Sequence, residues 1–222
     1  MRAAGRCGLC GGASLARVLP AAPRTLRLCA RCHLLQVDPA ERPTPEAAAR
    51  RYALHRNRLD DEGYVRFLER LLEPAARLLR PGARGLDFGC GPAPVLAELA
   101  RRRGFECDVY DPVFSPAEPV PPYDFLLASE VLEHFQDPEA GIGRAVGLVV
   151  PGGLFGVMTE SWRELDGLER WPYLSDPTHV VFYHAETFRW IAEAFGLRPV
   201  WDDGERVRLF RREEAASPPS PP

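Results

Sequence analysis

The spacing of apolar residues predicts alternating helices and short strands over most of the chain. Between Gly63 and Leu79 apolar side chains recur at helical spacing, which predicts one amphipathic helix that Pro81 and Gly82 end. From residue 84 the pattern becomes a strand (84–88), a glycine turn, a helix (95–103) and a second strand (105–110). This order is one βαβ half of a doubly wound, mostly parallel sheet.

The flanking segments carry simpler patterns. The pattern predicts a short helix at residues 46–58 and a second helix at 186–195. It also predicts a pair of antiparallel strands at 197–201 and 206–210. Four prolines in residues 213–222 predict a disordered tail. We therefore expect an α/β domain at 81–212, a helical connector at 41–80 and a separate module at 1–40.

Composition limits the class of protein. A chain of 222 residues that is 45% hydrophobic buries one sizeable core, and a net charge of −3 argues against a general nucleic-acid coat. Residues 1–58 nevertheless carry eleven Arg against three acidic residues, a net of +8. No apolar run approaches the roughly 18 residues of a membrane span, and the first ten residues lack a signal core. We expect a cytoplasmic protein without a membrane partner, whose six cysteines are thiols or metal ligands.

Four of these cysteines form two C-x-x-C pairs near the N-terminus, Cys7 with Cys10 and Cys29 with Cys32. Their spacing is typical of paired thiolate knuckles around a tetrahedral zinc ion. Four thiolates leave no open position on the ion, so the predicted role is structural: a small zinc ribbon at 1–40 that metal binding folds. The run from Cys29 to His33 also fits a c-type haem attachment, but the matching upstream pair favours zinc.

The glycine turn at 89–91 is typical of a site where the backbone approaches a nucleotide-like ligand. Asp111 ends the second strand and is placed to accept hydrogen bonds from both hydroxyls of a ribose. A dinucleotide and an adenosylated amino acid both fit this pattern. Pro94 stands where the dinucleotide motif needs glycine, and Asp87 lies two residues before the turn, suited to a positive amino-acid end.

Four segments in order resemble the motifs of class I S-adenosylmethionine-dependent methyltransferases, and the front end resembles the zinc-ribbon leader of some bacterial members. The segments are residues 85–92, 110–112, 123–135 and 151–159. The resemblance implies a Rossmann-like fold and a cofactor site formed by Asp87, Gly89, Cys90, Gly91, Asp111, Ser129 and Glu130. Only the proline-rich segment 112–122 separates the second strand from the next, so we expect a reduced sheet.

The acceptor side is expected beyond the fourth strand. Glu130, Glu133 and His134 have the spacing of one face at the start of a helix, and His179 follows the fifth strand. Glu133, His134 and His179 are the candidate catalytic residues: they supply a general base, or they bind a divalent cation such as Mg²⁺ that activates a hydroxyl. A similar Glu-x-x-Glu-His occurs in small-RNA 2′-O-methyltransferases and quinone O-methyltransferases. The alternative is that Glu130 contacts cofactor, Glu133 stabilises a helix start and His134 packs.

Several aromatic residues after the fifth strand have two interpretations, an acceptor pocket or core packing; they are Trp162, Trp171, Tyr173, Phe182 and Tyr183. Three functions follow from the whole pattern. The first is methyl transfer to a small-molecule acceptor, the second an RNA methyltransferase that uses the basic zinc ribbon, and the third a non-catalytic zinc-ribbon interaction protein. The sequence leaves the acceptor and the oligomeric state open.

Overall fold

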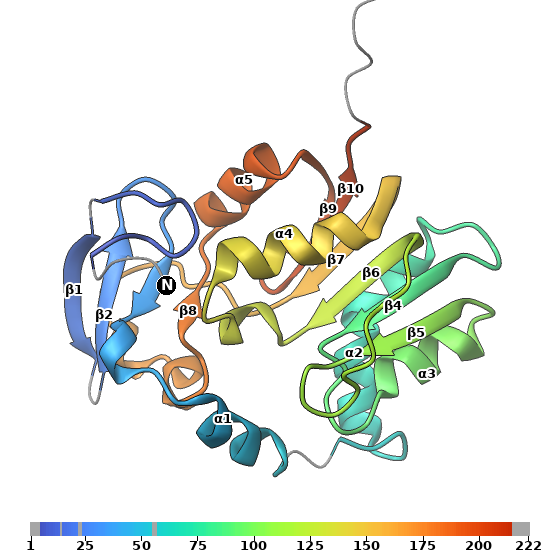
Figure 1. Ribbon diagram of the computed structural model, residues 1–222, viewed down its shortest axis with the longest axis horizontal. Coiled ribbons are helices and arrows are strands. Elements are labelled where there is room, and N and C mark those ends of the chain that lie inside the picture. The colour runs from blue at the N-terminus through green and yellow to red at the C-terminus, as the bar shows by residue number, and fades with distance from the viewer. Residues whose placement is uncertain (1–4, 14, 22–23, 55–56, 215–222) are drawn as a thin grey trace, which may run out of the picture.

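The computed structural model describes residues 5–13, 15–21, 24–54 and 57–214. The predicted tail lies outside these ranges from residue 215 onward. The described chain forms two sheets, a large one with helices on both faces and a smaller one at the N-terminal end (Figure 1). Among the described helices, none combines the length and apolar composition that a membrane crossing requires.

The large sheet is mostly parallel, as predicted. Its six strands lie in the order β5-β4-β6-β7-β10-β9. The four strands β4 (Arg84–Phe88), β5 (Glu106–Tyr110), β6 (Tyr123–Ser129) and β7 (Val149–Met158) are parallel. Strand β10 (Val207–Arg212) is antiparallel to both β7 and β9 (Leu197–Asp202), which confirms the predicted antiparallel pair.

The sheet is reduced, as the short proline-rich connection predicted. Residues 112–122 contain neither a helix nor a named strand, and the chain passes directly from β5 to β6. Strand β5 is therefore an edge strand. Proline donates no backbone hydrogen bond and fixes its φ angle, so a segment this rich in proline does not form a further crossover helix and strand.

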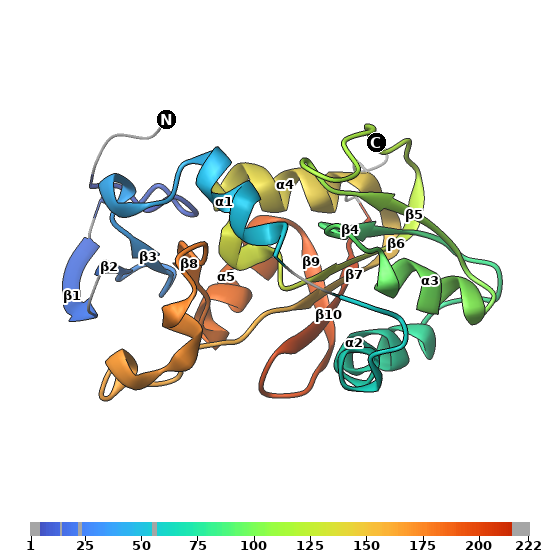
Figure 2. The same cartoon turned by 90° about the horizontal axis from the view of Figure 1, so that it is seen from below.

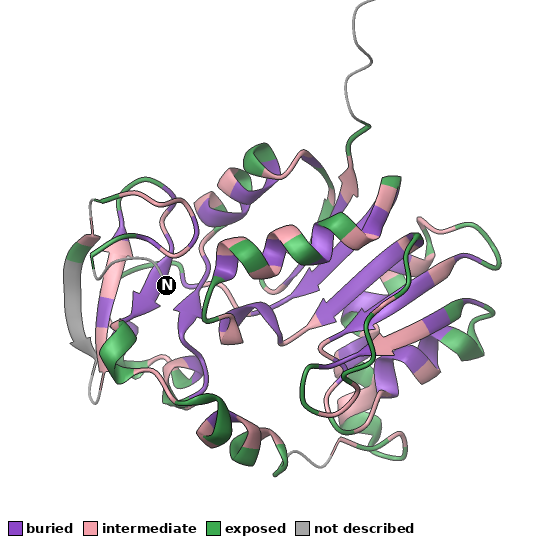
Figure 3. Cartoon of the chain, viewed as in Figure 1, coloured by how far each residue is buried: buried purple, intermediate pink, exposed green. Residues whose placement is uncertain are grey.

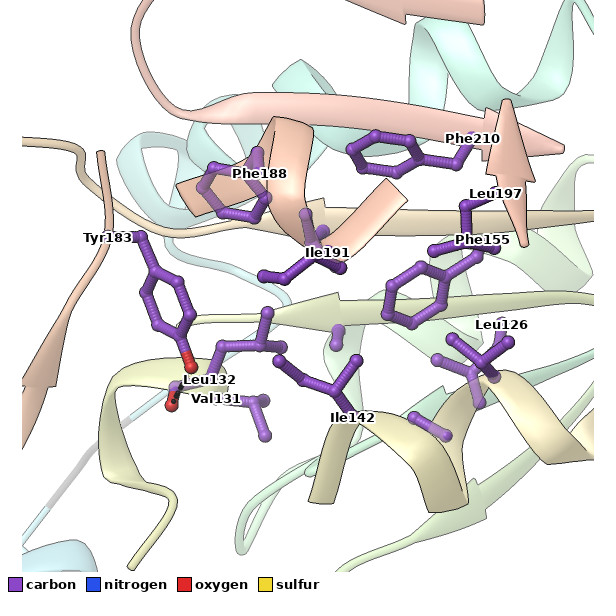
Figure 4. Close-up of a cluster of buried hydrophobic side chains, with 14 of the residues drawn as sticks. Leu126, Val131, Leu132, Ile142, Phe155, Tyr183, Phe188, Ile191, Leu197 and Phe210 are labelled. Atoms are coloured by element: carbon purple, nitrogen blue, oxygen red, sulfur yellow. Dashed lines mark hydrogen bonds between the residues drawn. The ribbon is translucent and has the colours of Figure 1, made fainter. Parts of the chain in front are cut away.

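Helices cover both faces of this sheet because apolar stripes on each face need burial. Helices α2 (Glu62–Ala76) and α3 (Val95–Arg102) pack on one face around Phe125. Helices α4 (Pro138–Leu148) and α5 (Ala185–Ala194) cover the other. There Ile142 and Ile191 meet Phe155 of the sheet (Figure 4). The inner strands are buried along most of their lengths, while the outer faces of the helices are exposed (Figure 3).

The small sheet joins two distant parts of the chain. Strands β1 (Leu15–Ala21), β2 (Arg24–Cys29) and β3 (Leu35–Val37) come from the N-terminal module, and β8 (Val181–Phe182) completes the sheet from the other end of the sequence. Leu35 pairs with Phe182 and Gln36 with Val181. A short 3₁₀ turn (η1, Pro39–Glu41) and helix α1 (Pro45–Tyr52) then lead toward α2 (Figure 2). The predicted strand pattern did not include β8, because two residues are too few to show a period.

Candidate active site

A cavity of about 750 Å³ lies where the carboxyl ends of β4, β5 and β6 meet. This volume is within the range of roughly 300–1,000 Å³ that ligand sites occupy. Its walls include most of the residues that the sequence assigned to cofactor and acceptor: Gly89, Cys90, Gly91, Asp111, Ser129, Glu130, His134 and His179. The structure thus places the two predicted half-sites in one cavity, at the sheet edge where open α/β folds bind ligands.

The glycine turn has backbone angles that favour glycine. Gly89 has φ 80° and Gly91 has φ 64°, both in the left-handed region. A Cβ on Gly89 would lie 2.5 Å from Val131 Cγ2, so the turn also packs against the next loop. The Gly89 N–H donates to the Tyr110 carbonyl at 2.7 Å, which ties this turn to the end of β5. The backbone between β4 and α3 is therefore held close to the cavity.

Asp111 is fixed at the cavity wall by backbone donors. Its Oδ1 accepts from the N–H groups of Val113 (2.8 Å) and Phe114 (3.0 Å), and its Oδ2 accepts from the Gly91 N–H at 3.1 Å. The side chain is 9% exposed. A carboxylate has about four acceptor sites, and these bonds use two on Oδ1 and one on Oδ2, so Oδ2 keeps capacity for a ribose hydroxyl.

Asp87 lies behind the glycine turn. It is 3% exposed, and its Oδ2 accepts from the Ala97 N–H at 3.1 Å in the first turn of α3. Burial raises the pKa of this carboxyl to about 7. In the described structure Asp87 joins the strand to the helix across the turn, and its contact with the amino-acid part of a cofactor remains a prediction.

The segment after β6 differs from the predicted helix start. Glu130 has φ 53° and its N–H donates to the Met158 carbonyl at 2.8 Å, while only Leu132–His134 form a single 3₁₀ turn. The prediction that Glu130, Glu133 and His134 share a helix face is therefore wrong. A helix needs right-handed angles at each residue, and the left-handed Glu130 turns its side chain elsewhere.

Glu130 lies beside Arg206 and the Tyr173 hydroxyl, which also contacts Glu133. Its Oε2 is 3.2 Å from the Tyr173 hydroxyl oxygen, and its Oε1 lies 3.5 Å from Arg206 Nη1. Burial and the nearby carboxylate of Glu133 raise the pKa of Glu130 to about 8. Glu130 thus lines the cavity in a largely protonated form near neutral pH.

The other three candidates gather into one cluster, which we call the acceptor cluster: Glu133, His134 and His179. One ligand atom from each lies within 4.8 Å of the others. Glu133 is fully buried; its Oε1 accepts from the Tyr173 hydroxyl, and its Oε2 has no hydrogen-bond partner in the described structure. The structure brings these groups together from the 3₁₀ turn after β6 and from the loop before β8.

Both imidazoles of the acceptor cluster have one nitrogen occupied. His134 Nδ1 lies 3.0 Å from the Thr178 carbonyl, and His179 Nδ1 lies 2.8 Å from the Tyr173 carbonyl. A carbonyl only accepts, so in each ring Nδ1 carries a hydrogen and Nε2 is the nitrogen left for a metal ion or a proton. The rings are 4.9 Å apart between centroids, and burial lowers the pKa of His179, which keeps that ring neutral near pH 7.

Part of the cavity wall is formed by aromatic residues that were not predicted from the sequence as site residues. Tyr52 at the end of α1 and Tyr64 with Phe67 on α2 line the cavity, together with Asn57 between the two helices. The five aromatic residues predicted after the fifth strand do not line it: Trp162, Tyr173 and Phe182 belong to a buried core with Trp171, and Tyr183 belongs to another. Their core interpretation is the correct one. The available signal was that Tyr64 and Phe67 share a face beside the apolar stripe of α2.

The N-terminal cysteines form a second group, away from the cavity. Cys7 Sγ lies 3.6 Å from Cys32 Sγ, and Cys10 Sγ lies 3.4 Å from Cys29 Sγ. All four sulfurs lie within 4.8 Å of one another. A tetrahedral zinc with Zn–S bonds of about 2.3 Å places its sulfurs about 3.8 Å apart, so the donor set and its size fit zinc.

Comparison with known proteins identifies the family of this chain. A family model for a methyltransferase domain matches residues 52–201. No curated protein sequence matches the chain. Among solved structures, the cyclase SpnF is 20% identical with a TM-score of 0.48, over 72% of this chain and 75% of that one. A putative methyltransferase from Bacillus halodurans is 14% identical with a TM-score of 0.47, over 66% and 99%. An O-methyltransferase family protein from Burkholderia thailandensis is 16% identical with a TM-score of 0.49, over 78% and 65%.

Proposed function

Because the chain belongs to the family of S-adenosylmethionine-dependent methyltransferases with a class I fold, we propose that it methylates a hydroxyl group of a small-molecule acceptor. The observation that carries this proposal is the position of the acceptor cluster. His134 and His179 line the same cavity as the glycine turn and Asp111. A group that activates an acceptor therefore faces the place where the methyl donor is expected.

The cofactor half of the cavity is assigned to the turn and the strand ends. Asp111 Oδ2 accepts from a ribose hydroxyl, and Gly89 with Gly91 lets the backbone approach the amino-acid part. Cys90, Ser129 and Glu130 line the adjoining wall. S-adenosylmethionine supplies an electrophilic methyl group on a sulfonium, so the protein's main task is to hold the acceptor oxygen in line with it.

The acceptor cluster fits a divalent cation. Two Nε2 atoms with lone pairs and one buried carboxylate oxygen without a partner form a two-histidine, one-carboxylate donor set. Both imidazoles donate their other N–H to a backbone carbonyl, the arrangement usual for metal-ligating histidines. A cation held by Glu133, His134 and His179 would lower the pKa of an acceptor hydroxyl. Nitrogen donors favour Mn²⁺, Fe²⁺ or Zn²⁺ over Mg²⁺, which prefers oxygen ligands.

The orphan oxygen of Glu133 favours this cation-binding role over a base-only role. An unpaired oxygen of a buried carboxylate is costly, and a bound cation would remove that cost. In the base-only alternative, with no cation bound, neutral His179 would accept the hydroxyl proton through its Nε2.

The acceptor side argues for a small molecule rather than RNA. It is lined by aromatic rings and by the acidic Asp176, which does not attract phosphates. Four arginines of the basic front end have internal partners: Arg24 and Arg42 donate to backbone carbonyls, Arg27 pairs with Asp38, and Arg51 pairs with Asp176. The zinc at the four cysteines is proposed as a structural ion.

Transfer of a labelled methyl group tests the proposal. Zinc-loaded protein and labelled S-adenosylmethionine are incubated, with and without Mn²⁺, with phenols, catechols and aliphatic hydroxy compounds, and in parallel with total RNA. We expect label in a hydroxylated small molecule, more with Mn²⁺, and its loss in His179→Ala. Label that enters RNA alone would contradict the small-molecule acceptor, and transfer that His179→Ala leaves unchanged would contradict the assigned cluster.

A further inference from the structure

The N-terminal cysteine module, defined as the described part of residues 5–37, contacts both segments that carry the acceptor cluster. The first segment, residues 131–138, holds Glu133 and His134. The second, residues 171–180, holds His179 and is called the acceptor loop. Figure 1 shows β8 running beside the strands of the module, directly after this loop.

Arg24, the first residue of β2, holds the acceptor loop through its backbone. Its guanidinium donates to the carbonyls of His179 (2.6 Å), Pro177 (3.4 Å) and Leu174. These three acceptors belong to the stretch that ends at the predicted catalytic histidine. A planar guanidinium offers several donors in fixed directions, so one side chain fixes several points of an irregular loop.

The module also reaches Glu133 through the backbone. The Val37 N–H of β3 donates to the Val180 carbonyl at 2.9 Å, and the Val180 N–H donates to the Glu133 carbonyl at 2.8 Å. Val180 is next to His179 in the chain. A short series of hydrogen bonds therefore runs from β3 through Val180 to the peptide of Glu133.

The cysteine loops themselves support the other segment. A Cβ on Gly8 would lie 3.1 Å from the Pro138 ring, and the Gly8 carbonyl accepts from the Glu139 N–H at 3.4 Å. Cys7 and Cys32 belong to the same buried cluster as Leu132 and Tyr183, and the Tyr183 hydroxyl donates to the Leu132 carbonyl at 3.0 Å. The packing of the first C-x-x-C loop is thus continuous with the turn that carries Glu133 and His134.

We propose that the metal-loaded cysteine module is a structural part of the acceptor site, and that Arg24 is the residue that positions His179 from it. Arg24 does not touch the reacting groups; it acts through the loop backbone. Metal binding at the four cysteines fixes β2 and β3, and these strands fix the geometry of Glu133, His134 and His179. The cofactor half of the cavity has its own support from β4, β5 and β6, so the dependence is confined to the acceptor half. This inference rests on the proposed function for the role of the cluster.

The test compares Arg24→Met with Arg27→Met in the full zinc-loaded chain. Arg27 lies on the same strand, but in the described structure its guanidinium bonds to Asp38 and not to the acceptor loop. We expect hydrogen exchange of the amides at 174–180 to accelerate at least about tenfold in Arg24→Met and to stay unchanged in Arg27→Met. Zinc content and S-adenosylhomocysteine affinity should stay within twofold in both, and Arg24→Lys should restore part of the protection.

The same variants are titrated with Mn²⁺ and followed by its electron paramagnetic resonance signal. We expect Arg24→Met to bind Mn²⁺ at least about tenfold more weakly than Arg27→Met. Equal exchange in the two variants would overturn the positioning role. A wild-type chain that binds no Mn²⁺ would overturn the cation part of the proposed function, and the exchange comparison would still decide on Arg24.

Discussion

Glu133 and Tyr173 form a buried pair at the acceptor side, in which the Tyr173 hydroxyl donates to Glu133 Oε1 and leaves Oε2 without a partner in the described structure. The same hydroxyl lies 3.2 Å from Glu130 Oε2 and 3.0 Å from the Thr159 hydroxyl. Tyr173 therefore fixes the direction of both carboxylates. The Glu133 carboxylate lies within 4.8 Å of a ring nitrogen of His134 and of His179, so a cation between them would be a partner for its open oxygen.

Glu133→Gln is expected to weaken Mn²⁺ binding and to stabilise the metal-free protein. The amide keeps an oxygen for the Tyr173 hydroxyl but removes the negative charge that a cation needs. In the metal-free protein the substitution removes a buried charge that no cation compensates. The free energy of unfolding should therefore rise by about 1–3 kcal/mol. Denaturant unfolding and Mn²⁺ titration measure the two effects. Unchanged Mn²⁺ affinity would exclude Glu133 as a ligand.

Asp87 predicts a dependence of stability on pH. Burial raises its pKa in the folded protein to about 7, above the ordinary value of a carboxyl. Between about pH 4 and 7 the folded state thus binds a proton that the unfolded state has lost, so this contribution is complete at low pH and is lost as pH rises through 7. Asp87→Asn keeps an acceptor for the Ala97 N–H and should flatten this loss. Urea unfolding at pH 5 and pH 8 measures the free energy of unfolding at each pH. If this free energy changes equally between the two pH values in variant and wild type, the assignment to Asp87 is contradicted.

Gly85 predicts a strict packing requirement in the central sheet. A Cβ at this position would lie 2.1 Å from the ring of Phe125, between β4 and β6. Gly85→Ala should therefore destabilise the fold by about 1–3 kcal/mol through overpacking. The matched control is Gly147→Ala in α4, where no atom lies within 4 Å of the added Cβ and helix propensity favours alanine by about 1 kcal/mol. Thermal unfolding should shift in opposite directions for the two variants.

We expect purified protein to contain one zinc ion per chain, bound by the four N-terminal cysteines. Removal by a strong chelator should lower the thermal midpoint, because the small N-terminal sheet has little apolar core of its own and zinc binding contributes to folding. Cys29→Ser should lose the zinc, while Cys107→Ser, a buried position in the other core, should keep it. Elemental analysis decides the point, and a zinc-free wild type that is as stable as the loaded form would contradict it.

Much of the fold could be predicted from the sequence because its signals are local. The strand, turn and helix from Arg84 to Arg102 follow from apolar spacing and glycine, and the acidic end of β5 follows from Asp111. The proline-rich connection also predicted the reduced sheet. The N-terminal cysteines were predicted as a group from their spacing, and the sulfurs do lie together.

The remaining features depend on long-range contacts or on single backbone angles. Pairing of β3 with β8 joins segments far apart in sequence, and β8 has only two residues. The spacing of Glu130, Glu133 and His134 favoured a helix, but the left-handed backbone angle at Glu130 prevents one from starting there. Tyr52 lines the cavity from the end of α1, which no local pattern shows. The acceptor cluster was predicted as residues, but the hydrogen bonds that fix both tautomers required the structure.

Calorimetric titration of S-adenosylhomocysteine into the zinc-loaded protein tests the central claim most directly, with Asp111→Asn and Asp108→Asn as a matched pair on the same chain segment. Asp111 lines the cavity, whereas Asp108 pairs with Arg84 and Tyr123 outside it. Loss of hydrogen bonds from a charged acceptor is worth about 1.5–3 kcal/mol, so Asp111→Asn should bind roughly ten- to a hundredfold more weakly. Asp108→Asn should bind like the wild type. No binding by the wild type, or equal affinity in the two variants, would contradict the assigned cofactor site.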